Sequence, residues 1–201
     1  MPNYKILHLI GGGEIGGAEQ HVLTLLEGIN SSSFALAVGC LVDGPFAQLT
    51  ESKHLPTLRF PMKHPLDLTP LPKLIEKIRQ EGFSLIHTHG SRANLLGRLA
   101  GRRLKLPVVS TVHSSLKQDY LSPQAALLAL ALDRLTLPMT SGVITVSEAL
   151  AQEVARRGAK NIRTIYNGVH SLPELAAEEE RARLRIHFRQ KWQIPEDALV
   201  L

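Results

Sequence analysis

Residues 4–27 read YKILHLIGGGEIGGAEQHVLTLLE, and this stretch decides the fold. Residues 5–10 form an apolar run that is long enough for a buried strand and too short for a helix. Seven glycine-rich positions follow, 11–17, where the chain can turn sharply and lie close to a ligand. Beyond them, apolar side chains fall on one helix face, at Ala18, Val22, Leu25 and Leu26. A strand, a glycine loop and a helix start direct free backbone N–H groups toward an anion such as phosphate.

The same alternation of strands and helices continues along the chain. Further strands are predicted at 35–42, 57–60, 84–89, 108–113, 143–146 and 162–166. Between them, helices are predicted at 47–52, over 71–78 with Thr69 as the N-terminal cap, at 92–104, at 123–137 and at 148–155. This alternation predicts an α/β fold, a Rossmann-like doubly wound, mostly parallel sheet with helices on both faces.

The overall composition is that of an ordinary globular protein. The chain has 201 residues, of which 44% are hydrophobic and 20% charged, and its formal net charge is +5. A positive charge suits a phosphate-bearing ligand, an anionic membrane or nucleic acid, but the 4% aromatic share argues against a stacking surface for nucleic acid. Cys40 lies in an apolar run, which predicts a buried thiol in a reducing compartment. With no signal-peptide pattern and no apolar run long enough to cross a bilayer, we expect a cytoplasmic protein.

The pattern changes after residue 170. We therefore expect one domain over 1–170, followed by a linker and charged helix over 171–201. Residues 195–201 resemble a turn and the opening of a strand, which predicts that a second domain follows. The alternative is an extra edge strand of a complete single domain.

Small polar residues follow several of the predicted strands, at the edge where ligands of parallel sheets bind. They are His89, His113, Ser114, Ser147, Glu148 and Asn167. Some of them have a structural interpretation: Ser147 is equally typical of a helix cap, and Asn167-Gly168 of a turn.

The glycine loop also matches the dinucleotide pattern at Gly11, Gly13 and Gly16, but the acid that would bind the ribose, Asp43, lies 27 residues beyond Gly16, where about 20 is usual. No lysine followed by serine or threonine comes after the glycines, which excludes a nucleotide-hydrolysing phosphate loop.

Histidines mark two of these strand ends. His87 and His89 alternate with Thr88, so both imidazoles lie on one face of their strand. A metal site needs further ligands, and the residues that follow offer none, so no metal site is predicted. We expect His87 to pack internally and His89 to reach the cleft. His113 stands at the mouth of its strand, which favours contact with a ligand over a place in the core.

Five motifs together resemble a known family. They are Gly16-Gly17-Ala18-Glu19, Leu85-Ile86-His87-Thr88-His89, Pro107-Val108-Val109-Ser110-Thr111-Val112-His113, Val143-Ile144-Thr145-Val146-Ser147-Glu148 and Ile165-Tyr166-Asn167-Gly168-Val169. In this order, over residues 4–170, the chain is similar to the N-terminal half of the GT-B retaining glycosyltransferases of family 4, the "group 1" class. Where that family usually has aspartate after Asn-Gly-Val, this chain has His170.

The resemblance implies an enzyme of two facing Rossmann-like domains, with an N-terminal half that recognises the acceptor. The C-terminal half would hold the nucleotide-sugar donor with a basic residue and a pair of glutamates, and neither a metal nor a cofactor is implied. By position, Gly16 and Gly17 would lie against a diphosphate or a phosphorylated acceptor. His113 would hydrogen-bond the transferred sugar as a positioning group, with Ser114 facing the acceptor and His89 on the acceptor side.

The resulting expectation is the acceptor-binding domain of a metal-independent retaining glycosyltransferase, inactive without its donor half. The acceptor could be a saccharide, a lipid or a small polyol, and nucleic acid is not expected as a partner. Two alternatives stay open: an NAD(P)-binding oxidoreductase domain and a non-catalytic binding module of glycosyltransferase descent. Lys117 and the leucine-rich segment 125–137 could also rest on the inner face of a membrane, unless that helix is buried in the domain.

Overall fold

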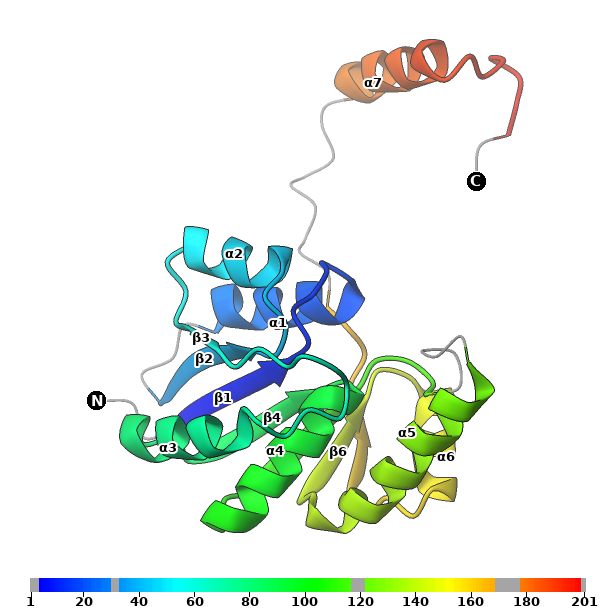
Figure 1. Cartoon of the computed structure of the whole chain (residues 1–201). Coiled ribbons are helices and arrows are strands. Elements are labelled where there is room, and N and C mark those ends of the chain that lie inside the picture. The colour runs from blue at the N-terminus through cyan, green and yellow to red at the C-terminus, as the bar shows by residue number, and fades with distance from the viewer. Residues whose placement is uncertain (1–3, 30–32, 117–121, 169–177, 200–201) are drawn as a thin grey trace. The chain divides into compact units, whose positions relative to one another are not determined.

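The computed structural model describes residues 4–29, 33–116, 122–168 and 178–199 (Figure 1). The chain divides into two compact units, Met1–Asn167 and Gly168–Leu201. Lys117, His170 and most of the predicted linker lie outside the described residues, as do Val200 and Leu201 of the predicted final strand.

The first unit is built on a seven-stranded sheet in which every neighbouring pair is parallel. The strands are β1 (Tyr4–Ile10), β2 (Phe34–Cys40), β3 (Thr57–Arg59), β4 (Leu85–His89), β5 (Val108–Val112), β6 (Gly142–Thr145) and β7 (Ile162–Thr164). Their order is β3-β2-β1-β4-β5-β6-β7, so the winding reverses between β1 and β4. The predicted Rossmann-like doubly wound sheet is confirmed, and the place of reversal is where such sheets bind ligands.

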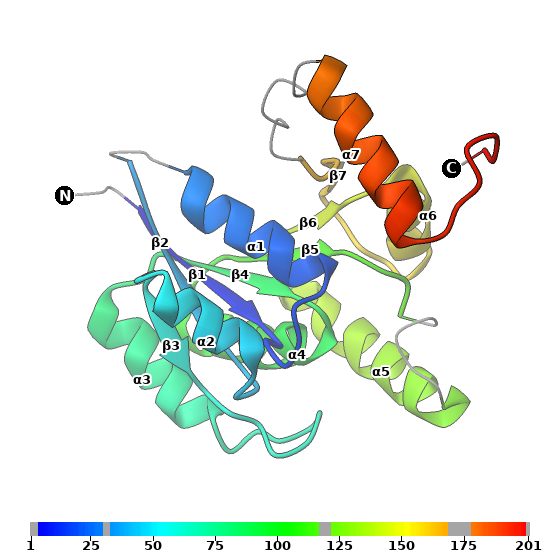
Figure 2. The ribbon, with the colours of Figure 1, turned by 90° about the horizontal axis from the view of Figure 1, so that it is seen from above.

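Helices cover both faces of this sheet (Figures 1 and 2). They are α1 (Gly17–Gly28), α2 (Pro45–Ser52), α3 (Leu71–Glu81), α4 (Ser91–Leu104), α5 (Pro123–Thr136) and α6 (Glu148–Arg156), with a short 3-10 turn at Leu137–Met139. One buried cluster joins α1 and α2 to the sheet through Val22 and Phe46. Another joins α3 and α4 to the opposite face through Leu74 and Leu96.

Helix α4 packs unusually close to the sheet because two of its residues are glycines. A methyl group on Gly97 would come within 2.3 Å of Thr88 Cγ2, and one on Gly101 within 2.2 Å of Val108 Cγ2. Carbon atoms in van der Waals contact lie about 3.5–4.0 Å apart, so any larger residue would push the helix away from β4 and β5.

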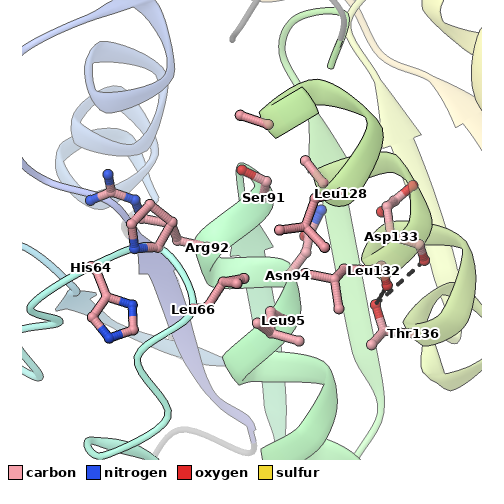
Figure 3. Close-up of a pocket in the computed structure, with 13 residues that line it drawn as sticks. His64, Leu66, Ser91, Arg92, Asn94, Leu95, Leu128, Leu132, Asp133 and Thr136 are labelled. Atoms are coloured by element: carbon pink, nitrogen blue, oxygen red, sulfur yellow. Dashed lines mark hydrogen bonds between the residues drawn. The ribbon is translucent and has the colours of Figure 1, made fainter. Parts of the chain in front are cut away.

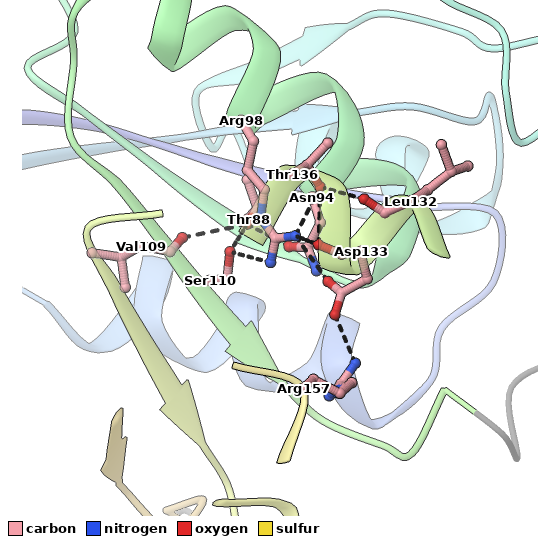
Figure 4. A network of polar contacts seen from close by, with 9 residues as sticks. All are labelled: Thr88, Asn94, Arg98, Val109, Ser110, Leu132, Asp133, Thr136 and Arg157. Carbon is pink, nitrogen blue, oxygen red and sulfur yellow. Dashed lines mark hydrogen bonds and ion pairs between the residues drawn. The ribbon is translucent and has the colours of Figure 1, made fainter. Parts of the chain in front are cut away.

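A buried polar network fastens α5 to α4 on the same face (Figure 4). Arg98 is 1% exposed and donates to Asp133 at 2.8 Å, while Arg157 donates to the other carboxylate oxygen at 2.8 Å. Thr88 and Ser110 connect the network to β4 and β5 through a 2.8 Å hydrogen bond between their hydroxyls. The leucine-rich sequence of α5 predicts a helix that is held by apolar contacts. In the structure, its buried contact with α4 is instead the ion pair between Asp133 and Arg98.

Helix α3 begins differently from the prediction that Thr69 caps it. Pro70 occupies the cap position, and the Thr69 hydroxyl donates to the Asp67 carboxylate at 2.6 Å. The threonine is drawn into the preceding turn because Asp67 also accepts from the Lys63 N–H. The helix ends at Gly82, whose backbone is left-handed with φ of 69°.

The second unit contains α7 (Glu178–Lys191), which carries Leu184 and Phe188 and is followed directly by Trp192. All three side chains are at least half exposed within the structure. Across the described residues of both units, no helix combines the length and the apolarity needed to cross a bilayer.

Candidate functional site

The glycine loop lies directly against the turn that follows β2. Gly12 adopts φ of +77°, and the Val42 N–H donates to the Gly11 carbonyl at 2.8 Å. A methyl group on Gly44 would come within 2.6 Å of the Gly12 carbonyl oxygen, so only glycine fits at this contact. Two glycine turns therefore hold each other in place, and the loop is fixed before any ligand arrives.

The start of α1 is open to a ligand. Gly16 is the N-cap, and its N–H donates to the Glu19 carboxylate at 3.2 Å. A methyl group on Gly17 would meet nothing within 4 Å, whereas one on Gly16 would lie 3.3 Å from the Glu19 carboxylate. Backbone N–H groups at a helix start, together with the helix dipole, favour an anion here.

Five histidines gather beside this loop on the α1 face of the sheet. Their strand register is the reason: His8 of β1 pairs with His87 of β4, and Ile10 pairs with His89. Ring contacts then connect β4 to His113 at the end of β5 and to His21 of α1, with centroids 5.3 Å apart for His89–His113 and 5.1 Å for His21–His113. We call His8, His21, His87, His89 and His113 the histidine cluster.

Two hydrogen bonds run through the cluster as a chain. His8 Nδ1 and His89 Nε2 are 3.1 Å apart, and His89 Nδ1 and His113 Nε2 are 3.0 Å apart. His87 Nε2 is bonded to the Thr111 hydroxyl at 2.7 Å. Within the described part of the chain, the buried Nδ1 of His113 has no hydrogen-bond partner. The chain thus ends on a nitrogen that a ligand could satisfy.

Burial keeps these imidazoles neutral. The pKa of His8 and of His113 is lowered to about 4 each, mainly by burial and to a smaller extent by the charge of a protonated His21. The pKa values of His87 and His89 also lie well below the usual value, first through burial and then through the neighbouring imidazoles. At neutral pH each ring therefore carries one N–H, so it can donate one hydrogen bond and accept another.

The structure corrects the expected roles of the two histidines on β4. His89, which was expected to line the cleft, is only 2% exposed and has both ring nitrogens bonded within the cluster. His87, which was expected to pack internally, is half-buried and borders a cavity. The reason is the central position of β4, because side chains from β1 and β5 close over the end of the strand.

The remaining predicted residues divide into two groups. Asn167 joins the cluster, since its side chain hydrogen-bonds His21. Ser114 follows His113 and is exposed at the end of β5. Ser147 accepts from the Leu150 N–H at 3.3 Å and so caps α6, with Glu148 exposed in the first turn. Among the described residues, neither Ser147 nor Glu148 bonds to the histidine cluster.

Sequence reasoning missed His8 and His21. His8 lies inside the apolar run of β1, and His21 lies between the apolar positions of α1. Period-two alternation places His8 on the same face as Ile10, but which residue of another strand it meets depends on register.

Two cavities of about 260 Å³ lie in the first unit. One lies beside the cluster, between α1 and the sheet, and is lined by His8, His21 and His87 together with apolar side chains. The other lies between α4, α5 and the loop after β3 (Figure 3). Leucines line its interior, and His64, Arg92 and Asn94 provide its nitrogen-bearing side chains.

Two groups of residues bear on cofactors and metals. His8, His87 and His89 each offer a nitrogen within 4.8 Å of the other two, which is a candidate set of metal ligands. Asp43, the acid required for a dinucleotide ribose, is paired with Arg59 at 2.7 Å. That ion pair weighs against the oxidoreductase alternative.

Residues 15–171 match the sequence model of Glycosyltransferase Family 4. The chain belongs to this family. The match covers the start of α1 and four of the five cluster histidines, whereas His8 and the rest of β1 precede it. Among curated proteins, the chain is similar to the UDP-Gal:alpha-D-GlcNAc-diphosphoundecaprenol alpha-1,3-galactosyltransferase of Escherichia coli. The two are 28% identical over 114 residues, which is 54% of this chain and 30% of that protein.

Solved family structures share the fold. Anabaena Alr3699/HepE, crystallised with UDP-glucose, is 24% identical and has a TM-score of 0.72, and the match covers 92% of this chain and 49% of that one. A glycosyltransferase from Rickettsia africae is 16% identical with a TM-score of 0.72, over 98% of this chain and 52% of that one. This chain therefore spans about half the length of these relatives, and it corresponds to the N-terminal half of a GT-B fold.

Proposed function

We propose that this chain is the acceptor-recognising domain of a metal-independent, retaining glycosyltransferase that uses a nucleotide-sugar donor. One observation carries the proposal. At the point where the sheet winding reverses, the start of α1 lies one turn before His21, whose ring contacts that of His113, and the buried Nδ1 of His113 has no partner among the described residues. A phosphate-bearing sugar substrate would satisfy both groups at once.

The chemistry of glycosyl transfer fits these groups. Breaking the bond to a nucleoside diphosphate builds negative charge on the leaving phosphate, and the fixed N–H groups at Gly17 stabilise such charge. The sugar becomes oxocarbenium-like, and a hydrogen bond from His113 would orient it. Because burial lowers the pKa of His113 to about 4, the ring is a weak base, which favours positioning over proton transfer.

We further propose a lipid-linked saccharide as the acceptor. The cavity between α4 and α5 is mostly apolar, while Arg92 at the start of α4 supplies a cation for a phosphate. Leu128 of the cavity wall is 48% exposed, so the apolar lining continues onto the outer surface. The Escherichia coli relative is named for an acceptor of this kind, a diphosphoundecaprenol-linked sugar. The enzyme would then work in the cytoplasm, at the inner face of a membrane.

A transfer assay tests whether this chain transfers sugar without a donor-binding half. The chain is incubated with radiolabelled nucleotide sugar and a water-soluble prenyl diphosphate bearing N-acetylglucosamine. We expect no labelled product, because the donor-binding half is not in this chain. Turnover by the 201 residues would contradict the proposal. A complete reading frame without the glutamate pair would favour the non-catalytic module instead.

Binding of the same acceptor probe tests the cavity. We expect Arg92→Gln and Leu128→Glu each to weaken binding at least about tenfold, equivalent to about 1.4 kcal/mol. A probe without the prenyl chain should lose sensitivity to Leu128→Glu and keep sensitivity to Arg92→Gln. If both probes bind the two variants as tightly as the wild type, the acceptor does not use this cavity.

A further inference from the structure

Three imidazoles of the histidine cluster converge from two strands. His8 Nδ1 and His89 Nε2 are 3.1 Å apart, close to the roughly 3.3 Å between two nitrogens bound tetrahedrally to zinc at 2.0–2.1 Å. His87 brings a third nitrogen, and all three lie within 4.8 Å of one another. Pairing of β1 with β4 fixes this approach, because His8 and His87 are register partners.

Hydrogen bonds to other residues already orient two of the three rings. His87 uses Nε2 to bond the Thr111 hydroxyl at 2.7 Å, which leaves its Nδ1 for a metal. His89 uses Nδ1 to bond His113 at 3.0 Å, and its Nε2 faces His8. Metal-binding histidines are typically held in this way, through a hydrogen bond on the second ring nitrogen.

We propose that His8, His87 and His89 bind one divalent transition-metal ion of the zinc type, with a water from the adjoining cavity as the fourth ligand. The sequence predicts no metal site, because the residues that follow His87 and His89 offer no further ligand. The fold brings a third histidine, His8, from another strand. The chemistry of the set is consistent: neutral imidazoles with one open position suit Zn²⁺, and no carboxylate of the kind that Mg²⁺ or Ca²⁺ prefers belongs to it.

The cavity between α1 and the sheet supplies both access and space. It has a volume of about 260 Å³ and is lined by His8 and His87. His87 is partly exposed toward this cavity, which gives an ion access to its ring. Phe34, Ile144 and Ile165 form apolar walls around the open position.

Metal binding would also fix the protons of the chain that leads to His113. The ion takes lone pairs on His8 Nδ1 and His89 Nε2, so the His89 proton must sit on Nδ1 and be donated to His113 Nε2. His113 then carries its own proton on Nδ1, the nitrogen without a partner, and becomes a hydrogen-bond donor there. No proton is released, since each ring keeps one. The proposed ion contacts neither the substrate nor the reacting atoms, and only its effect on the His113 proton rests on the role proposed for His113.

Cobalt(II) titration of the untagged, metal-free chain tests the site. We expect one Co²⁺ per chain, with the visible absorption of a four-coordinate ion, displaced by one equivalent of Zn²⁺. His8→Gln and His87→Gln should each weaken binding at least about a hundredfold. Thr111→Val keeps all three ligands and removes one supporting hydrogen bond, so it should weaken binding roughly 10- to 100-fold. His187→Gln, an exposed histidine of α7, should change nothing.

Any of three results would overturn the proposal. The chain does not bind Co²⁺ stoichiometrically, the bound Co²⁺ shows only the spectrum of a six-coordinate ion, or His87→Gln binds Co²⁺ as tightly as the wild type does. Should His8→Gln fail to fold, His87→Gln and Thr111→Val still decide the question, with circular dichroism as the check on folding. Separately, ¹⁵N spectra of His113 with Zn²⁺ should show its proton on Nδ1. A proton on Nε2 would reject the tautomer while leaving the metal site intact.

Discussion

His8, His89 and His113 share protons along hydrogen bonds of 3.1 and 3.0 Å, inside a sheet where charge is disfavoured. Each ring depends on the next for its second bond, so the properties of His113 are set by residues that no ligand touches. His113 was identifiable from its place after a strand. His8 was not, because His89, its partner, is 81 residues away and only the register of two strands brings them together.

Acid should destabilise the fold through these histidines. Burial lowers the pKa of His8 from 6.5 to about 4, so its stabilising effect is complete above pH 6.5 and is lost as the pH falls to 4. The shift corresponds to about 3 kcal/mol for His8. Urea unfolding with a chelator present should show this decline, with a shallower slope in His8→Asn and an unchanged one in His187→Asn. A flat profile for the wild type between these pH values would contradict the buried, neutral cluster.

At the scale of elements, periodicity predicted the alternation of helices and strands because local apolar spacing determines it. Periodicity could not predict which residues of other elements the helices contact. Arg98 falls among the leucines of α4, and its partner Asp133 is 35 residues away on α5. The Thr69 hydroxyl, expected as a helix cap, bonds the Asp67 carboxylate instead, and Pro70 occupies the cap position.

The Asp133 network should be a main source of stability for α5. Asp133→Asn would leave Arg98 and Arg157 buried without their counter-ion, and such uncompensated charges typically cost about 3–5 kcal/mol. We expect a loss of that order in the free energy of unfolding. Glu27→Gln removes an exposed ion pair with Lys53 and should cost no more than about 1 kcal/mol. Equal losses in the two variants would show that the network adds nothing.

The close packing of α4 gives a second test. Gly101→Ala would force a methyl group against Val108, and overpacking of this kind typically costs about 1–3 kcal/mol. Gly28→Ala places a methyl group in open space at the end of α1, so it should be neutral or stabilising. Thermal unfolding of both variants compares them directly. A Gly101→Ala protein as stable as the wild type would mean that α4 can move off the sheet without penalty.

At the scale of the whole molecule, the chain has a formal net charge of +5 and exposes several leucines of α5. Leu127 is 67% exposed and Leu135 is 71% exposed, although the helix is anchored in the domain by Asp133. The two sequence interpretations of this helix, a membrane contact and a buried element, therefore describe opposite faces of it. Such an arrangement suits a protein that meets a lipid-linked acceptor at an anionic surface.

Vesicle co-sedimentation tests this contact. We expect the chain to bind vesicles that contain anionic lipid and to bind less when Leu127→Gln and Leu135→Gln are combined, since these changes remove apolar area without changing charge. Leu184→Gln, which alters an exposed leucine of α7, serves as the matched control. Binding that ignores both anionic lipid and the α5 leucines would end the membrane hypothesis.

We propose that an acceptor binds at the carboxyl ends of the strands, from Arg92 of the cavity between α4 and α5 to His113 at the end of β5. The most direct measurement is an amide and imidazole NMR titration of this chain with the soluble prenyl-diphosphate sugar, and in parallel with UDP-glucose. We predict that the acceptor probe shifts the resonances of Gly17, Arg92, His113 and Ser114, and that UDP-glucose alone shifts them far less. Shifts confined to other parts of the chain, or a response to the nucleotide sugar only, would contradict the account.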